Sequence, residues 1–201
     1  MSKELEKARE LVKMLEQKEK ESKIKLSELR RGESFMIGEH EFIVLDQVVD
    51  VTKVISKCFM AENISFDPNT RDYNKSKIKK FIEEKIQPVI ESEVGAENIV
   101  EHEVSLRSVD MQKEFEDVSA KVRPITFDEA RLYNDLLVNE DLDNLWWTLT
   151  PWSTEKRGYR YGIAAVFPSG DFDSSFCSRN YGVRPFCILK SNIFVSKKGD
   201  K

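Results

Sequence analysis

The spacing of apolar residues changes along the chain and predicts an α+β fold. Near the N-terminus, apolar residues recur every three or four positions, as on one face of an amphipathic helix. These positions are Leu5, Ala8, Val12 and Leu15. Glu19 and Ser22 occupy the next two positions of this register, so a long coiled coil is not expected. We expect a helical segment over residues 1–27 that docks on its own domain or joins copies of the chain in an oligomer.

Residues 28–201 form the second predicted unit, a single domain. Turns at Arg31-Gly32-Glu33 and Gly38-Glu39 separate short runs rich in Phe, Ile and Val, which is typical of antiparallel strands. The core residues expected from these runs are Phe35, Ile37, Phe42, Val44, Val48, Val54, Ile55, Phe59 and Met60. Asp67-Pro68-Asn69 is a turn signal that ends this part of the chain.

Two helices are predicted in the middle of the chain. Residues 74–93 have helical spacing of apolar positions, with Pro88 as an interruption. A second helix begins at Thr126, because Glu129 stands three residues later and completes a capping box. Its inward face carries Ala130, Tyr133, Leu136 and Leu137.

The C-terminal quarter holds all three tryptophans and most of the glycine-centred turns. Its pattern predicts short strands at residues 146–149, 163–167, 172–177 and 183–189. Tight turns are expected at Gly158, Ser169-Gly170 and Tyr181-Gly182.

Composition and charge narrow the possible environments. The chain has 201 residues, a formal net charge of -4 and three cysteines, Cys58, Cys177 and Cys187. Such sparse cysteines, with neither a signal peptide nor a spanning segment in the pattern, predict a cytoplasmic protein without a membrane partner. The negative charge disfavours nucleic acid. A local basic run keeps that alternative open: Lys53, Lys57, Lys75, Lys77, Lys79 and Lys80.

The order of motifs resembles a family of uncharacterised proteins found in bacterial genomes and prophages. The resemblance covers about residues 28–195 and rests on Gly38 to Leu45, Trp146-Trp147, Thr150-Pro151, Ser169-Gly170 and Gly182-Val183-Arg184-Pro185. It implies a C-type-lectin-like fold, distantly similar to the formylglycine-generating enzyme and to variable tropism proteins of phages. In that fold two helices flank a small twisted antiparallel sheet, and loops between the last strands contact ligands. Fold alone does not define function.

Metal and catalytic sites have weak support in the sequence. Asp67-Pro68-Asn69 and the pair Asp171 and Asp173 could ligate a cation, but a turn and a solvated hairpin edge are the favoured interpretations. Cys177 and Cys187 invite comparison with a copper-thiol oxidase, although their spacing does not match and no general base stands beside them. Both histidines, His40 and His102, are interpreted as surface residues. We therefore expect no catalytic residue and no cofactor.

Aromatic and arginine residues of the C-terminal loops are the favoured ligand-binding set, because Trp, Tyr and Arg dominate the energetics of protein interfaces. The set is Trp152, Arg157, Tyr159, Arg160, Tyr161, Phe176, Arg179, Asn180 and Tyr181. Trp146, Trp147 and Arg184 are assigned structural roles. The sequence therefore predicts a non-enzymatic recognition module that binds a protein or a glycan. The resemblance adds a phage-encoded inhibitor of a host defence enzyme or a virion-associated receptor-binding protein as hypotheses.

Overall fold

The computed structural model describes residues 5, 7, 9–14 and 22–198. Residues 5, 7 and 9–14 are helical, and Leu5 and Val12 of the expected stripe are exposed. Ala8 and Leu15 lie outside the described residues. Docking of this helix on its own domain is therefore not seen at the described positions, and its pairing with another copy stays a prediction. The folded domain begins at Lys23, before the expected boundary at residue 28, because residues 23–25 form strand β1 and Leu26 is fully buried.

A seven-stranded antiparallel sheet has the order β1-β14-β2-β3-β4-β13-β8. Its strands are β1 (Lys23–Lys25), β2 (Ser34–Ile37), β3 (His40–Val48), β4 (Val51–Ser56), β8 (Val122–Pro124), β13 (Pro185–Lys190) and β14 (Phe194–Lys197). The two C-terminal strands lie between strands from earlier in the chain. This sheet is therefore assembled from both ends of the sequence.

A five-stranded sheet has the order β11-β10-β9-β12-β5, and β6 pairs with β7 in a two-stranded ribbon. The strands are β5 (Ala61–Ser65), β6 (His102–Val104), β7 (Val118–Ala120), β9 (Trp146–Pro151), β10 (Gly162–Val166), β11 (Phe172–Phe176) and β12 (Asn180–Val183). β12 pairs with β9 in parallel at Gly182 and Trp146, whereas the other pairings are antiparallel. The fold is thus mixed and mostly sheet, as the α+β class predicts. The sheets are larger than the single small sheet expected.

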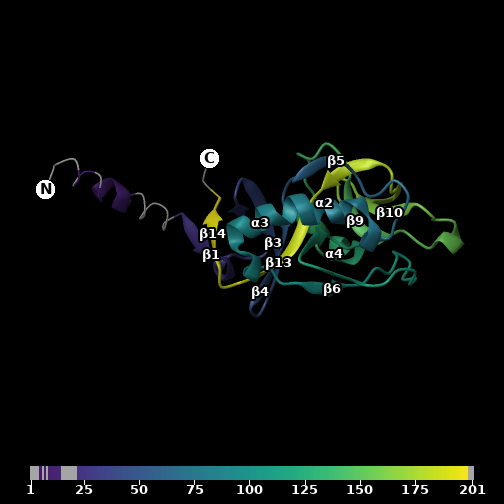
Figure 1. The fold of residues 1–201 in the computed structure, drawn as a ribbon, viewed down its shortest axis with the longest axis horizontal. Helices are drawn as coiled ribbons and strands as arrows, with labels where there is room; N and C mark the ends of the chain where they lie inside the picture. The colour runs from purple at the N-terminus through teal and green to yellow at the C-terminus, as the bar shows by residue number, and fades with distance from the viewer. Residues whose placement is uncertain (1–4, 6, 8, 15–21, 199–201) are drawn as a thin grey trace.

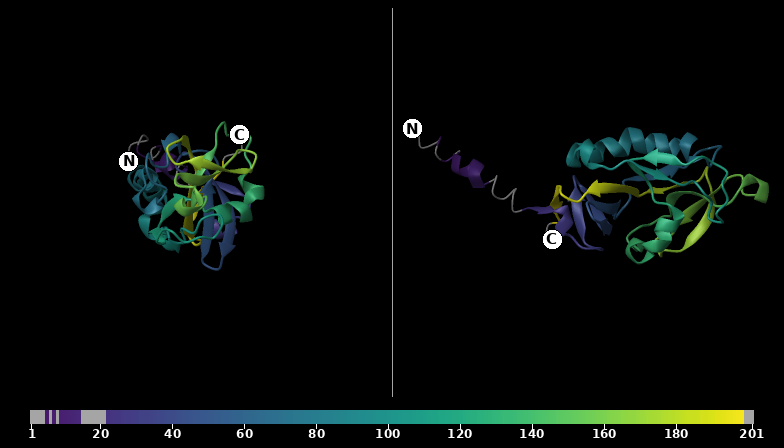
Figure 2. Two further views of the ribbon diagram at one scale, coloured as in Figure 1. Left: turned by 90° about the vertical axis from the view of Figure 1, so that its right-hand side faces the viewer. Right: turned by 90° about the horizontal axis from the view of Figure 1, so that it is seen from below.

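Helices cover the strands from two sides (Figures 1 and 2). One long helix consists of α2 (Lys77–Phe81), a π-helical stretch η3 (Ile82–Ile86) and α3 (Gln87–Val94). Pro88 lies at the start of α3, so the predicted interruption takes the form of the π-helical stretch before it. On the other side lie α4 (Phe127–Leu132) and α5 (Asn134–Leu137). Short 3-10 turns complete the helical content: η1 (Leu26–Glu28), η2 (Tyr73–Lys75), η4 (Ala96–Asn98) and η5 (Glu155–Arg157).

Each helical layer packs against both large sheets. Ile78, Ile82, Ile86 and Ile90 of the long helix share one buried cluster with residues of both sheets, including Trp147. The second cluster joins α4 and α5 to both sheets and includes Ala130, Tyr133, Leu137, Trp146, Val166 and Phe186. The helical spacing predicted for residues 74–93 and the inward positions predicted for the helix that begins at Thr126 are therefore confirmed. The prediction that Val48 belongs to the core is wrong, because Val48 lies at the end of β3 and is 47% exposed.

The chain passes from one large sheet to the other at Arg184, between β12 and β13. Its buried guanidinium donates from Nε to the Ser56 carbonyl at 3.0 Å and from Nη1 to the Leu137 carbonyl at 2.9 Å. It also lies 4.7 Å from the Trp146 ring centroid. Arg184, Trp146 and Trp147, to which structural roles were assigned, are all fully buried. Gly182 lies within β12, so the predicted turn at Tyr181-Gly182 is wrong.

Candidate recognition surface

An open cleft lies beside the C-terminal end of β11, bordered by the loop between β9 and β10. It has a volume of about 400 Å³, and its lining consists of Gly158, Tyr159, Arg160, Tyr161, Gly162, Ser174, Ser175 and Phe176. Three aromatic side chains of the lining remain open to solvent: Tyr159 is 43% exposed, Tyr161 37% and Phe176 61%. Large apolar groups left in water at one cleft are typical of a binding surface.

The predicted ligand-binding residues fall into two groups. The exposed group consists of Arg157, Tyr159, Arg160, Tyr161, Phe176, Arg179 and Asn180. Arg160 lines the cleft and stacks over Tyr161, with its guanidinium carbon 5.4 Å from the ring centroid. In Figure 1 the loop between β9 and β10 projects from the end of the molecule opposite β1 and β14. The surface is thus far from the N-terminal strands.

Trp152 and Tyr181, also in the predicted ligand-binding set, are half-buried and pack against other aromatic rings. The Trp152 ring meets Phe127 edge-on, with centroids 6.4 Å apart. The Tyr181 ring lies 4.7 Å from that of Trp147, and its hydroxyl is 2.7 Å from the Ser175 hydroxyl. Both residues support the sheet beneath the cleft.

The loop bordering the cleft is held from below by Arg71, a buried residue that the sequence pattern did not single out. Its Nε donates to the Arg160 carbonyl at 3.0 Å, and its other nitrogens bond to the Ser153 carbonyl and the Glu114 carboxylate. These partners are distant from Arg71 in sequence, so no local sequence motif predicts the contacts. The bonds fix the loop backbone on which Tyr159 and Tyr161 stand, which reduces the entropy lost on binding.

Asp110 holds the same loop from a second side. It accepts hydrogen bonds from the Ser108 hydroxyl at 2.5 Å and the Ser153 hydroxyl at 2.6 Å, and it pairs with Arg157. These two hydroxyls, together with the guanidinium, lower the pKa of Asp110 to about 2. Arg157 was predicted to contact a ligand, but its guanidinium already has a carboxylate partner. Its role is therefore at least partly to position the loop.

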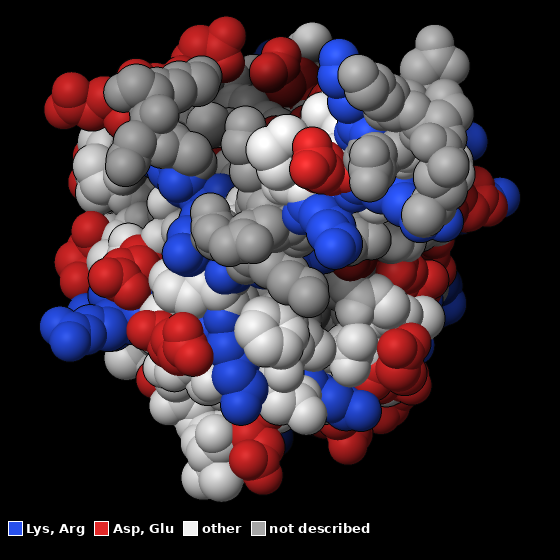
Figure 3. Space-filling view, turned by 90° about the vertical axis from the view of Figure 1, so that its left-hand side faces the viewer, with Lys and Arg blue, Asp and Glu red and all other residues white. Residues whose placement is uncertain are grey.

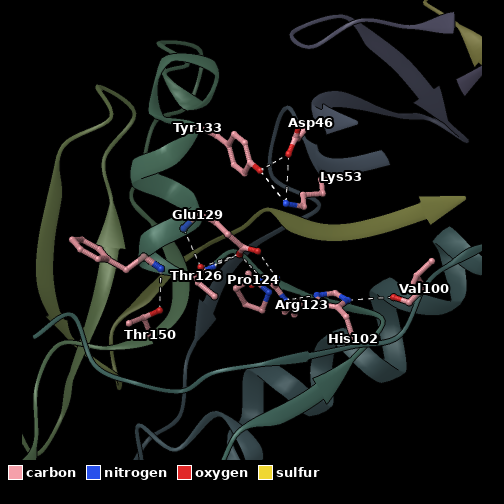
Figure 4. Close-up of polar contacts among 11 residues, drawn as sticks. Asp46, Lys53, Val100, His102, Arg123, Pro124, Thr126, Glu129, Tyr133 and Thr150 are labelled. Carbon is pink, nitrogen blue, oxygen red and sulfur yellow. Dashed lines mark hydrogen bonds and ion pairs between the residues drawn. The ribbon is translucent and has the colours of Figure 1, made fainter. Parts of the chain in front are cut away.

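A polar network centred on Arg123 links α4 to a strand of each large sheet (Figure 4). The Arg123 guanidinium forms a double contact with Glu129, at 2.8 and 2.7 Å, and its Nε donates to His102 Nε2 at 2.9 Å. Glu129 and Thr126 form the predicted capping box. The backbone N–H of Phe127 in this first turn donates to the Thr150 hydroxyl at 2.9 Å.

This network also supports the aromatic face near the cleft. Phe127, held by the capping box and Thr150, packs edge-on against Phe172 of β11, with ring centroids 5.0 Å apart. It makes the contact with Trp152 described above. The interpretation of both histidines as surface residues is wrong, because His40 and His102 are each half-buried, and the His102 ring lies 6.0 Å from that of Phe186.

Cys177 and Cys187 do not have the character of a reactive pair. Cys177 follows β11 at the edge of the five-stranded sheet, whereas Cys187 lies on β13 inside the seven-stranded sheet. Both are fully buried free thiols. Burial raises the pKa of Cys177, with the charge of Asp67 adding to the effect, and raises the pKa of Cys187 to about 12. Both environments oppose the thiolate that copper binding or nucleophilic attack requires.

The carboxylates considered as metal ligands have structural explanations. Asp67 accepts backbone hydrogen bonds from Asn69, Thr70 and Lys77 at 2.8 to 3.0 Å, so it closes the predicted turn. Asp171 and Asp173 are exposed at the hairpin. Within the described ranges, no group of three or more His, Cys, Asp or Glu side chains is arranged to hold a metal ion.

Most lysines of the basic run pair with acids. Lys53, Lys57, Lys75, Lys79 and Lys80 each lie within 4 Å of a carboxylate. At the end of the molecule where β1 and β14 lie, acidic and basic side chains are likewise mixed (Figure 3). None of the helices in the described part of the chain has both the length and the apolar character that crossing a membrane requires.

Comparison of the chain with protein-family models, curated proteins and solved structures found no match. The surface is therefore interpreted from its own geometry.

Proposed function

We propose that this chain is a non-enzymatic recognition module that binds a protein partner through the cleft beside β11. One observation carries the proposal: Tyr159, Tyr161 and Phe176 converge on a single cleft and remain open to solvent. Burying such rings against a partner would release bound water and provide large contact areas with few rotatable bonds.

The rigidity of the surrounding loop supports this function. Arg71 and Asp110 anchor the loop from two sides. A fixed aromatic surface loses little conformational entropy when a partner binds. A glycan is the second ligand class, since aromatic rings also stack on sugars. Protein is favoured because the cleft lies beside the open edge of a sheet.

The C-type-lectin-like fold and a phage origin come from the resemblance alone and stay predictions. The same holds for a cytoplasmic location and for inhibition of a host defence enzyme. A copper-thiol oxidase is disfavoured by the separate, buried thiols. Oligomerisation through the N-terminal helix is a further prediction, based on the exposed Leu5 and Val12.

The test is capture of partners from a bacterial lysate with the full chain, followed by titration of the purified partner. We expect Phe176→Ala to weaken binding by about 30-fold, the effect of losing a central aromatic contact. Phe194→Ala is the matched control, because Phe194 is 66% exposed but lies on β14 at the other end of the molecule. Equal losses for both variants would contradict the proposal. Binding of an arrayed glycan that is lost in Phe176→Ala would replace the protein ligand by a sugar.

A further inference from the structure

Strand β11 lies at one edge of the five-stranded sheet. It pairs with β10 from Phe172↔Val166 to Phe176↔Gly162, and within the described residues no other strand pairs with it. An unpaired strand edge presents backbone donors and acceptors that can bind a further strand. Proteins commonly protect such edges with charged side chains, lysine above all, with proline or with a bulge. β11 has the sequence FDSSF, in which Asp173 is the one charged residue and neither lysine nor proline occurs.

The register shows which backbone groups point away from β10. The Cys177 N–H donates to the Tyr161 carbonyl at 2.8 Å, and the Phe167 N–H donates to the Asp171 carbonyl at 2.9 Å. The odd-numbered residues of this segment therefore face β10. Because hydrogen-bonding direction alternates along an antiparallel strand, Phe172, Ser174 and Phe176 turn their backbone groups toward the open edge.

Two of these outward groups already have partners in the chain. The Ser174 N–H donates to its neighbour Asp173 at 2.7 Å, and the Phe176 carbonyl accepts from the Arg179 N–H at 2.9 Å. The N–H and carbonyl of Phe172, the carbonyl of Ser174 and the N–H of Phe176 remain for an incoming chain. They alternate along the strand, as the hydrogen bonds of an added strand require.

The cleft is positioned to receive a side chain from such a strand. A Cβ atom on Gly162 would lie 3.0 Å from the Ser174 Oγ and 3.5 Å from the Tyr159 ring, so the glycine keeps the cleft open on this face of the sheet. By strand alternation, Phe172, Ser174 and Phe176 project to this same face. A residue of the added strand opposite Ser174 would project its side chain to this face, beside the lining of the cleft.

The charge of the cleft indicates which kind of residue in the added strand should neighbour the inserted side chain. Arg160 is the one charged residue of the lining, and it forms an exposed ion pair with Glu155 at 3.6 Å. An acidic group of the partner would compete easily for a guanidinium held so weakly.

We propose, resting on the recognition function above, that the partner supplies an extended peptide segment that adds to β11 as a sixth strand. The segment inserts an apolar or aromatic side chain into the cleft and brings a carboxylate to Arg160. Main-chain bonds to Phe172, Ser174 and Phe176 provide affinity, and the cleft provides selectivity.

The probe is a short peptide, selected from a displayed library of random peptides by binding to the immobilised full chain. Each backbone amide of a selected peptide is then methylated in turn, and its affinity is measured by fluorescence anisotropy. We expect losses of about tenfold at two amides two residues apart, which donate to the carbonyls of Phe172 and Ser174, and little change at the amide between them, because one lost hydrogen bond has about this effect. Neutralising the peptide's carboxylate and the Arg160→Gln substitution should each weaken binding, and the two changes together should weaken it by less than the product of their separate effects.

The two proposals fail in different ways. If Phe176→Ala weakens peptide binding but methylation shows no alternation, strand addition is overturned and recognition at the cleft remains. If Phe176→Ala leaves the peptide's affinity unchanged, the cleft itself is not the site. Failure to select any peptide that depends on Phe176, while the captured protein partner still does, also overturns strand addition.

Discussion

The Nε2 atom of His102 accepts a hydrogen bond from the Nε of Arg123, so the imidazole must hold its single proton on Nδ1, 3.2 Å from the carbonyl oxygen of Val100. Both ring nitrogens are satisfied in this neutral tautomer. Protonation of Nε2 would place two donors opposite each other. The contact therefore specifies a neutral histidine that links β6 to β8.

Folding stability should consequently depend on pH through His102. Desolvation, with the charge of Arg123, lowers the pKa of His102 in the folded chain below its usual value of 6.5. The unfolded chain then binds the proton first as pH falls. The contribution of neutral His102 to the free energy of unfolding is therefore present in full above pH 6.5 and is lost as pH falls through the lowered pKa of His102 in the folded chain. Urea unfolding at several pH values should show this slope in the wild type and a smaller slope in His102→Gln. His40→Gln is the control, and an identical change in both variants would contradict the assignment.

Removal of Glu129 should destabilise the fold strongly. Glu129→Ala leaves the buried Arg123 guanidinium without its carboxylate and breaks the capping box, so we expect a loss of about 3 kcal/mol or more in unfolding free energy. Asp128→Ala, at an exposed neighbouring position, should change it by less than about 0.5 kcal/mol. Denaturant unfolding checks both values. A small effect for Glu129→Ala would show that the network adds little.

Substitution of Arg184 by lysine should also lower the free energy of unfolding strongly. A lysine cannot reproduce the planar fork that reaches both Ser56 and Leu137 and stacks on Trp146. We expect Arg184→Lys to lower the unfolding free energy by about 3 kcal/mol. Arg179→Lys is the exposed control. Similar denaturation midpoints for the two variants would contradict a large contribution of the Arg184 guanidinium to stability.

The thiols should differ sharply in reactivity. Cys58 is exposed, whereas Cys177 and Cys187 are fully buried with raised pKa values. A thiol reagent should therefore modify Cys58 in the native chain and all three cysteines in urea, with Cys58→Ser abolishing the native reaction. Rapid native labelling of Cys177 or Cys187, or tight uptake of monovalent copper that depends on both, would revive the oxidase alternative.

Local sequence patterns predicted the local parts of the structure well. The capping box at Thr126 and Glu129 and the glycine turn at Gly170 each depend on residues close in sequence. The exposed aromatic residues of the cleft were also among those expected. In contrast, Val48 looked like a core residue because alternation alone does not show where a strand leaves the core.

Long-range contacts could not be inferred in this way. Arg71 reaches Ser153 and Arg160, which lie more than 80 positions away in the chain. The contact of His102 with Arg123 joins the two-stranded ribbon to the seven-stranded sheet, an arrangement that no spacing rule specifies. Sheet order likewise follows from packing of the whole chain, so the number and size of the sheets were underestimated.

The strand order of the larger sheet has a consequence for biosynthesis. β13 separates β4 from β8, and β14 separates β1 from β2, so a nascent chain emerging from the ribosome lacks the segments that join these strands. Until residues 185–197 are released, the earlier strands have open edges of the kind that associate wrongly with other chains. Completion of this domain therefore awaits the synthesis and release of residues 185–197, and chaperones that shield strand edges would have most effect on the chain before that point.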